Sequence, residues 1–458
     1  MLGAAACGCA ERRAAPAETP PAAPPSPSLG PNEVFLADQA RRIVDSARIG
    51  AGQAVGIYHN DTAYDLRVPG GNMAYSAFWV RDSAMMLGAD LISAAEVEGW
   101  IRLICATLRG SDWRVRPGVV VPAYAVPDHV NFNGLATYYP GNYETGDQQG
   151  GHPWGKYPPL DDDYYFISMV HEHWRLTKDL RLWGSAVRTM AGEEVLAEVC
   201  EKTYRRPLAD PATGLVTIWD VGDENAKDWG FCDGVFKAGK VLFPSVLKLV
   251  AARQMAELFA ASGEGGKAQL YREEAARIAA AIGSTFLHPT VDGSEGWLHS
   301  ATGVGNQPDV WGSAFAIHCG VLDGPTTQKV SRALVRAYRE RTAVRNGFIR
   351  QILTSDEKNR GGWEMSVVEV NKYQNGGYWG TPSGWYISAV YKSDPGAARE
   401  LAREYVQFLQ GHMREDGTTQ GWEWCNVDTG DYANPLYVAT VALPYISLRE
   451  AGLLSLLD

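Results

Sequence analysis

The sequence of 458 residues has few cysteines and no long hydrophobic run. Its seven cysteines include no CxxC pair, which argues against a structural zinc site. Five of them are scattered between residues 105 and 425, where we expect buried free thiols, with one disulfide as the alternative. No apolar stretch is long enough to span a bilayer, so the sequence predicts no transmembrane helix.

Positive charge is also scarce. The formal net charge is −11, and no basic stripe interrupts the sequence, so nucleic acid is not an expected partner. The sequence shows no metal-ligand constellation, no phosphate-binding loop after a strand and no nucleophilic serine elbow. We therefore predict no cofactor and no metal, and leave a bound calcium ion as the alternative.

The first thirty residues differ in composition from the rest. Residues 15–28 are rich in alanine and proline and predict an extended linker. Ahead of them, "LGAAACGC" resembles the end of a bacterial lipoprotein signal, with Cys7 or Cys9 as the lipid anchor, although the charged start and apolar stretch of a full signal are missing. We expect residues 1–30 to be a truncated signal and linker on an exported, periplasmic or membrane-anchored bacterial lipoprotein. If the likeness is accidental, a cytoplasmic protein is the alternative.

Helical periodicity dominates the sequence that follows, in two kinds of segment. One kind is amphipathic and predicts helices with one solvent-exposed face at 33–48, 97–109, 182–205, 267–287, 326–341 and 397–413. The other kind is apolar on nearly all sides and predicts buried helices at 83–92, 164–174, 235–261, 310–322, 384–391 and 435–448, with a kink at Pro244. Strand-like alternation is scarce, and residues 118–126 suggest one short hairpin.

The two kinds of helix alternate six times, which predicts an all-α (α/α)6 toroid over residues 31–458, with the buried helices as its inner ring. The inner helices of such a toroid run parallel, so the loops before them gather at one mouth. Each of these six loops carries Trp or Tyr beside acids, amides or arginine. A helix cap explains an acid at such a position but not repeated tryptophan. Rings, amides and carboxylates in one pocket suit a carbohydrate.

The third of these loops contains "WDVGDENAKDW" (219–229), in which four acids stand close together. Crowded carboxylates repel, so one of them holds its proton to a higher pH, as a general acid must. The stretch resembles the acid loop of six-hairpin glycosidases, most closely glycoside hydrolase family 63 and mannosylglycerate-hydrolase-like proteins. Glu224 stands where that family has its acidic Asp, and Asp223 replaces a hydrophobic residue.

Three further loops resemble the same family. "WEWCNVDTG" (422–430) is similar to the run that carries its catalytic base, which places Glu423 in that role. "NGGYWGTPSGWY" (375–386) resembles its substrate loop, and "FWVRDS" (78–83) resembles the entry to its first inner helix. The large β-sandwich common in the family has no room in this chain, so other six-hairpin families remain alternatives.

The resemblance implies an inverting glycoside hydrolase that acts on an α-linked gluco- or manno-configured oligosaccharide. Glu224 would protonate the leaving oxygen, and Glu423 would activate a water, with Asp223, Asp220 and Glu364 beside Trp363 as fallback acids. For the run 161–163 we expect helix capping and solvation. The predicted substrate-binding residues are Trp79, Arg81, Asp82, Asp223, Asn225, Trp229, Asp309, Trp311, Gln374, Asn375, Trp379 and Trp422.

Three alternatives share the same scaffold. A sugar epimerase would need paired histidines at the mouth, and a uronic-acid hydrolase or lyase would need several cations there. The third is a glycan-binding lipoprotein that keeps the cavity but has lost catalysis.

Overall fold

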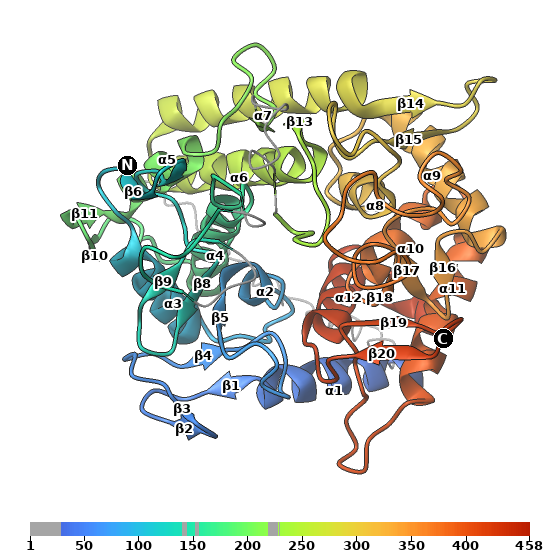
Figure 1. The fold of residues 1–458 in the computed structure, drawn as a ribbon, viewed down its shortest axis with the longest axis horizontal. Helices are drawn as coiled ribbons and strands as arrows, with labels where there is room; N and C mark the ends of the chain where they lie inside the picture. Colours follow the sequence, from blue (N-terminus) through green and yellow to red (C-terminus); the bar gives the residue numbers. More distant parts are fainter. Residues whose placement is uncertain (1–28, 140–143, 152–154, 219–227, 229) are drawn as a thin grey trace, which may run out of the picture.

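The computed structural model describes residues 29–139, 144–151, 155–218, 228 and 230–458. In these residues, twelve α-helices alternate between an inner ring and an outer ring around a common axis (Figure 1). The outer helices are α1 (Pro31–Ser46), α3 (Ala94–Thr107), α5 (Leu196–Arg205), α7 (Gly265–Phe286), α9 (Gly324–Arg339) and α11 (Pro395–Gln410). The inner helices are α2 (Val80–Ala84), α4 (Asp162–Thr177), α6 (Leu242–Ala261), α8 (Val310–His318), α10 (Ser383–Tyr391) and α12 (Ala439–Glu450). This is the arrangement expected of an (α/α)6 toroid.

The buried residues of the outer and inner helices agree with the two kinds of segment predicted from the sequence. In α9 the buried side chains include Val330, Leu334 and Tyr338, which recur at helical spacing along one face. In α8 and α10 every residue except the last is buried. The outer helices begin at well-formed caps: the Asp323 carboxylate accepts from the backbone of Thr326 at 2.7 Å, and Ser93 forms a capping box with Glu96 before α3.

Three predicted helices differ from the structure. Helix α2 ends at Ala84 instead of continuing to residue 92, because Gly88, Ala89 and Asp90 have positive φ and cannot extend a right-handed helix. Residues 186–195 form a hairpin before α5, so only the second part of the range 182–205 is helical. The predicted kink at Pro244 is wrong, because Pro244 is the third residue of α6. A backbone N–H at that position would have no intrahelical acceptor, so proline removes no helical hydrogen bond there.

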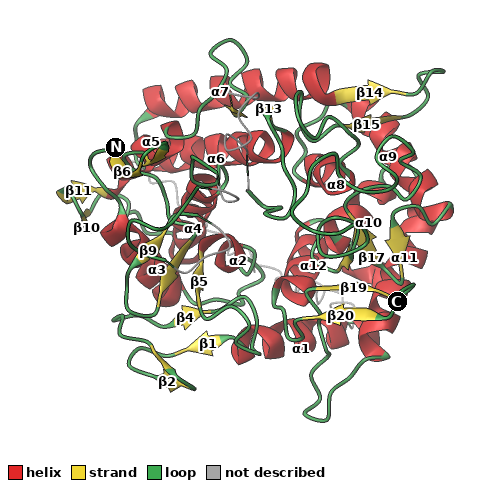
Figure 2. Ribbon diagram, viewed as in Figure 1, coloured by secondary structure: helices red, strands yellow, loops and turns green. Residues whose placement is uncertain are grey.

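The protein contains more β-structure than the all-α fold expected from the sequence. The described residues contain eight small antiparallel sheets. Their short strands lie among the helices (Figure 2). The largest sheet has the order β16–β17–β18–β19–β20. A short hairpin is present near the predicted range 118–126, but it spans residues 113–121, where β6 pairs with β7. The strands are β1 (Arg48–Ile49), β2 (Ala54–Val55), β3 (Tyr58–His59), β4 (Leu66–Arg67), β5 (Ala77–Trp79), β6 (Trp113–Arg116), β7 (Val119–Val121), β8 (His129–Asn131), β9 (Ala136–Thr137), β10 (Ala186–Thr189), β11 (Gly192–Val195), β12 (Thr217–Ile218), β13 (Gly239–Lys240), β14 (Leu287–Pro289), β15 (Gly296–Leu298), β16 (Val344–Arg345), β17 (Phe348–Arg350), β18 (Tyr378–Trp379), β19 (Trp424–Asn426) and β20 (Asp431–Ala433).

The first and last helices close the ring. Helix α1 packs against α12, and a 3-10 turn at Leu454–Leu457 packs against α1 and α11. Asn32 at the start of α1 donates its backbone N–H to the Asp458 carboxylate at 2.9 Å. The segment 1–28, with Cys7 and Cys9, lies outside the described residues.

The described cysteines agree with the sequence expectation: all five are free, and four of them are buried. Within the described ranges, no helix combines the length and the apolar character needed to cross a membrane.

Gly347 offers a test of the packing between the central sheet and the outer ring. It has a φ of +77° in the turn between β16 and β17, and a Cβ there would lie 2.3 Å from the Cα of Tyr405 in α11. We expect Gly347→Ala to lower the free energy of unfolding by roughly 3 kcal/mol, measured by urea denaturation.

Gly293→Ala is the matched control, because Gly293 also has a positive φ but meets nothing within 4 Å. It should cost only about 1 kcal/mol. Equal losses in the two variants would show that backbone strain alone, not the approach to Tyr405, makes the glycine necessary.

Candidate active site

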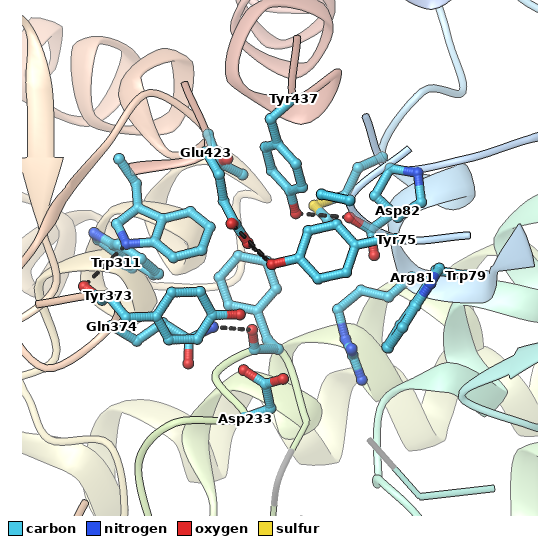
Figure 3. Close-up of a pocket in the computed structure, with 16 residues that line it drawn as sticks. Tyr75, Trp79, Arg81, Asp82, Asp233, Trp311, Tyr373, Gln374, Glu423 and Tyr437 are labelled. Atoms are coloured by element: carbon cyan, nitrogen blue, oxygen red, sulfur yellow. Dashed lines mark hydrogen bonds between the residues drawn. The ribbon is translucent and has the colours of Figure 1, made fainter. Parts of the chain in front are cut away.

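A cavity of about 280 Å³ opens where the loops before the inner helices converge (Figure 3). Among the described residues, those that line it come from the loop-and-helix junctions at α2, α6, α8, α10 and α12. Its lining residues are Pro69, Ala74, Tyr75, Trp79, Arg81, Asp82, Met85, Phe231, Asp233, Trp311, Tyr373, Gln374, Trp379, Thr381, Glu423 and Tyr437. The predicted residues Trp79, Arg81, Asp82, Trp311, Gln374, Trp379 and Glu423 are thus brought together in one cavity.

Aromatic side chains form most of the wall and hold one another in place. The rings of Trp311 and Trp379 meet edge to face with centroids 5.6 Å apart, and Trp379 meets Tyr437 in the same way at 6.0 Å. Trp79 stacks on His129 behind the wall at 4.2 Å. The indole N–H of Trp311 donates to the Ile349 carbonyl, which fixes the ring further. Such a wall is rigid and apolar, with ring faces and edges available to a ligand.

Glu423 is buried in the wall, just before β19, with only 2% of its surface exposed. The Tyr75 hydroxyl donates to both of its carboxylate oxygens at 2.8 Å, and the Asn434 amide donates to Oε2 at 2.5 Å. Burial raises the pKa of Glu423 to about 8, against the lowering effect of these two donors, and the neighbouring Asp233 and Asp82 raise it further. Burial also raises the pKa of Tyr75, so its phenol keeps the proton that it donates.

Asp82 lies on α2 at the other side of Tyr75. It accepts a hydrogen bond of 2.6 Å from the Tyr437 hydroxyl, which comes from the loop before α12. Burial raises the pKa of Asp82 to about 6, although Tyr437 and Arg81 both lower it. The first and last hairpins of the ring are therefore joined through a carboxyl group that faces the cavity.

Arg81 is held from behind by three buried aspartates. Its Nε and Nη2 bind Asp161 at 2.7 and 3.0 Å, Nη2 lies 3.4 Å from Asp162, and Nη1 lies 3.5 Å from Asp128. We expected solvation and helix capping for the run 161–163, but all three of its aspartates are fully buried. Asp163 pairs instead with buried Arg206, and no side-chain cap is formed by Asp161.

Asp233 is the acid in the cavity that the sequence analysis did not single out. It is partly buried, it follows the acidic loop at 219–229, and its carboxylate points toward the cavity (Figure 3). Burial raises its pKa above the ordinary value. Gln374 fixes this segment, because its amide accepts from the Gly234 N–H at 2.7 Å and donates to the Phe231 carbonyl at 3.3 Å. The signal that could have identified Asp233 is its place shortly before α6, in the same loop.

Three residues at the cavity have strained backbone conformations. Phe231 and Tyr373, which line the cavity, have φ of 55° and 44°, and Asn434, which binds Glu423, has φ of 45°. Non-glycine residues keep such conformations only where their surroundings enforce them, and they cluster at functional sites.

Three predicted substrate-binding residues lie outside the cavity lining. Asp309 caps α8 by accepting from the Gly312 N–H at 2.8 Å. The Asn375 amide bridges the Trp363 N–H and the Val368 carbonyl. Trp422 packs on Tyr432 with ring centroids 4.5 Å apart.

The remaining predictions fall elsewhere. The fallback acid Glu364 accepts from the Gly305 N–H and does not line the cavity. Glu224, Asp223, Asn225 and Trp229, together with Asp220, lie outside the described residues. Across the described ranges, no group of three His, Cys, Asp or Glu side chains could hold a metal ion.

No family model matches the chain, and no curated protein matches it either. Among solved structures, it resembles a wild-type glycosidase with 15% identity over 92% of this chain and 97% of that chain, at a TM-score of 0.51. A Streptococcus pneumoniae protein, from work on metal-independent alpha-mannosidases and complexed with alpha-1,6-mannobiose, gives 12% identity, coverage of 92% and 94%, and a TM-score of 0.51. A bacterial glucoamylase complexed with acarbose gives 12% identity, coverage of 93% and 57%, and a TM-score of 0.50. At these identities the likeness establishes a shared fold, which fits the toroid.

Glu423 provides a test through pH-dependent stability. Because its folded pKa lies above the ordinary 4.5, the native state binds the proton more tightly, and stability is lost as the pH rises toward about 8. A glutamine has no proton to lose. We therefore expect the stability of Glu423→Gln relative to the wild type to rise by at least about 1 kcal/mol when the pH is raised from 5 to 8. The free energy of unfolding of both proteins would be measured with urea at the two pH values.

Glu364→Gln is the control, because this exposed glutamate lies outside the cavity. Its free energy of unfolding should differ from that of the wild type by the same amount at pH 5 and at pH 8. A Glu423→Gln variant that gains nothing at pH 8 would mean that the Tyr75 and Asn434 donors keep Glu423 ionised.

Arg81 gives a second stability test. We expect Arg81→Met to cost roughly 3–5 kcal/mol of unfolding free energy, because it leaves three buried aspartates without their cation. Arg181→Met is the control, since Arg181 is 92% exposed and its pairing with Asp179 is worth about 1 kcal/mol or less. Thermal and urea unfolding would compare the two, and similar losses would contradict the central role of Arg81.

Proposed function

We propose that the protein is a glycoside hydrolase that acts on an α-linked gluco- or manno-configured oligosaccharide. The observation that carries the proposal is the meeting of Glu423, Asp233 and Asp82 in one aromatic-walled cavity at the mouth of the toroid. Aromatic walls cover the apolar faces of a sugar ring, and carboxyl and amide groups bind its hydroxyls. Hydrolysis of a glycosidic bond requires two such carboxyl groups, one protonated and one ionised.

Glu423 is the proposed base. Its two hydrogen-bonding neighbours, Tyr75 and Asn434, both donate to its carboxylate oxygens, which opposes the effect of burial on its pKa. With a pKa raised to about 8, Glu423 acts as the base in its ionised fraction, which grows as the pH rises toward 8. Tyr75 donates to both carboxylate oxygens, so an attacking water has to take the place of one of these bonds. The likeness of "WEWCNVDTG" to the base motif of glycoside hydrolase family 63 supports the same role.

The proposed acid comes from the loop before α6. Glu224 occupies the motif position, and Asp233 is the described carboxyl of that loop that reaches the cavity. Either one would protonate the leaving oxygen while Glu423 activates water on the opposite face of the sugar. We propose inversion of the anomeric centre, for which the two carboxyl groups should lie roughly 6.5–9.5 Å apart.

The ligands of the structural neighbours fit the proposed substrate class. Glucose, alpha-1,6-mannobiose and acarbose occur in complexes with proteins of this fold. A uronic acid suits the cavity less well, because Arg81 is the sole cation among its described lining residues and is already balanced by Asp161, Asp162 and Asp128. No histidine lines the described cavity, which weighs against an epimerase.

The test is turnover on α- and β-linked gluco-, manno- and galacto-oligosaccharides, with product anomers followed by proton NMR. We expect inverted product, and a loss of about 10²–10⁴-fold in kcat for Glu423→Gln and for the variant of the true acid. Glu224→Gln and Asp233→Asn decide between the two acids, because only the acid variant should recover activity on aryl glycosides with acidic leaving groups.

Glu364→Gln serves as the control and should keep its activity. Retained product configuration would overturn the inverting mechanism. Saturable sugar binding that survives Glu423→Gln, with no turnover of any glycoside by the wild type, would instead identify a glycan-binding protein.

A further inference from the structure

A second hollow, of about 740 Å³, adjoins the cavity and has no role in the proposed chemistry. It lies between the β2–β3 hairpin and residues 73–76, and we call it the hairpin groove. Ala74 lines both the groove and the cavity, so the two hollows approach each other at this residue. Tyr75 faces the cavity, while Met73 and Ser76 on either side of it line the groove.

One small sheet connects the two spaces. Strand β5 ends at Trp79 in the cavity wall, where it pairs with His129 of β8. At the other end of the pairing, Ala77 lies opposite Asn131, which lines the groove. The sheet therefore contributes one end to the cavity wall and the other end to the wall of the groove.

The groove combines the groups that recognise sugars. Tyr58 lies edge-on to buried Phe132 with ring centroids 6.0 Å apart and is still 42% exposed. The amide side chains of Asn131 and Asn133 supply donors and acceptors. His59 and Asp61, paired at 2.6 Å, add further polar groups at the rim. An exposed ring supported from behind, with amides beside it, is the same chemistry as that of the cavity.

We propose that the hairpin groove binds the leaving-group side of the oligosaccharide, that is, the sugar units beyond the bond that is cleaved. This inference rests on the proposed hydrolase function and deepens it. The cavity holds the unit whose anomeric carbon reacts, and the groove, with more than twice its volume, holds the units that follow. Substrates with several units beyond the cleaved bond are therefore preferred over disaccharides.

The test uses the full chain with Glu423→Gln, so that oligosaccharides stay intact, and measures binding of α-linked gluco- and manno-disaccharides and tetrasaccharides by calorimetry. We expect the tetrasaccharide of the preferred series to bind about tenfold more tightly than the disaccharide. Adding Tyr58→Ala should abolish most of this gain and weaken disaccharide binding much less, because a disaccharide places only one unit beyond the cleaved bond. Tyr58→Phe keeps the ring and should keep the gain.

Tyr391→Ala is the matched control, because Tyr391 is 37% exposed at the C-terminal end of α10, away from the mouth. It should leave both affinities unchanged. Equal affinities for short and long chains would overturn the groove proposal, as would equal weakening of both by Tyr58→Ala.

A parallel assay of the wild type separates this proposal from the proposed function. A length-dependent gain that Tyr58→Ala abolishes, without hydrolysis of any substrate by the wild type, would overturn the hydrolase and leave the groove as a glycan site. Hydrolysis with no preference for longer chains would overturn the groove alone. Absence of binding at every length would overturn both.

Discussion

The buried contact between Arg81 and its three aspartates is the interaction on which the rest of the site depends. It joins α2, the loop before β8 and the start of α4, three segments that are far apart in the sequence. A guanidinium has enough donors to bind several carboxylates at once, and burial makes such bonds strong but leaves unpaired charge costly. Trp79 and Asp82, on either side of Arg81 in the sequence, are positioned by this anchor.

The same anchor gives the cavity its electrostatic character. The single cation of the described lining is matched by aspartates behind it, whereas Asp82, Asp233 and Glu423 face the open space. Burial and mutual repulsion raise the pKa values of all three carboxyl groups, so the site holds protons that an exposed cluster would release. Protonated carboxyl groups can donate hydrogen bonds to a ligand in the cavity, and one that ionises can only accept them.

The helical plan could be predicted from sequence, because amphipathic and all-apolar segments differ in their periodicity. The short strands could not, since pairs such as Tyr378 with Cys425 join two- and three-residue segments that have no alternation of their own. The burial of the run 161–163 was also out of reach, because its partner Arg81 lies eighty residues earlier. Glu423 was identifiable from its motif and its flanking tryptophans, whereas Asp233 and Tyr75 required knowledge of which way each side chain points.

The contact between α1 and α12 has a consequence for how the molecule is made. Helix α1, the first described helix along the sequence, packs against α12, the last described one. Until α12 has been synthesised, the buried face of α1, with Leu36, Ile43 and Val44, lacks one of the helices that pack against it. Closure across nearly the whole chain is a slow, entropically costly step. The ring cannot close before α12 has been made, and apolar surface left uncovered until then is prone to aggregation.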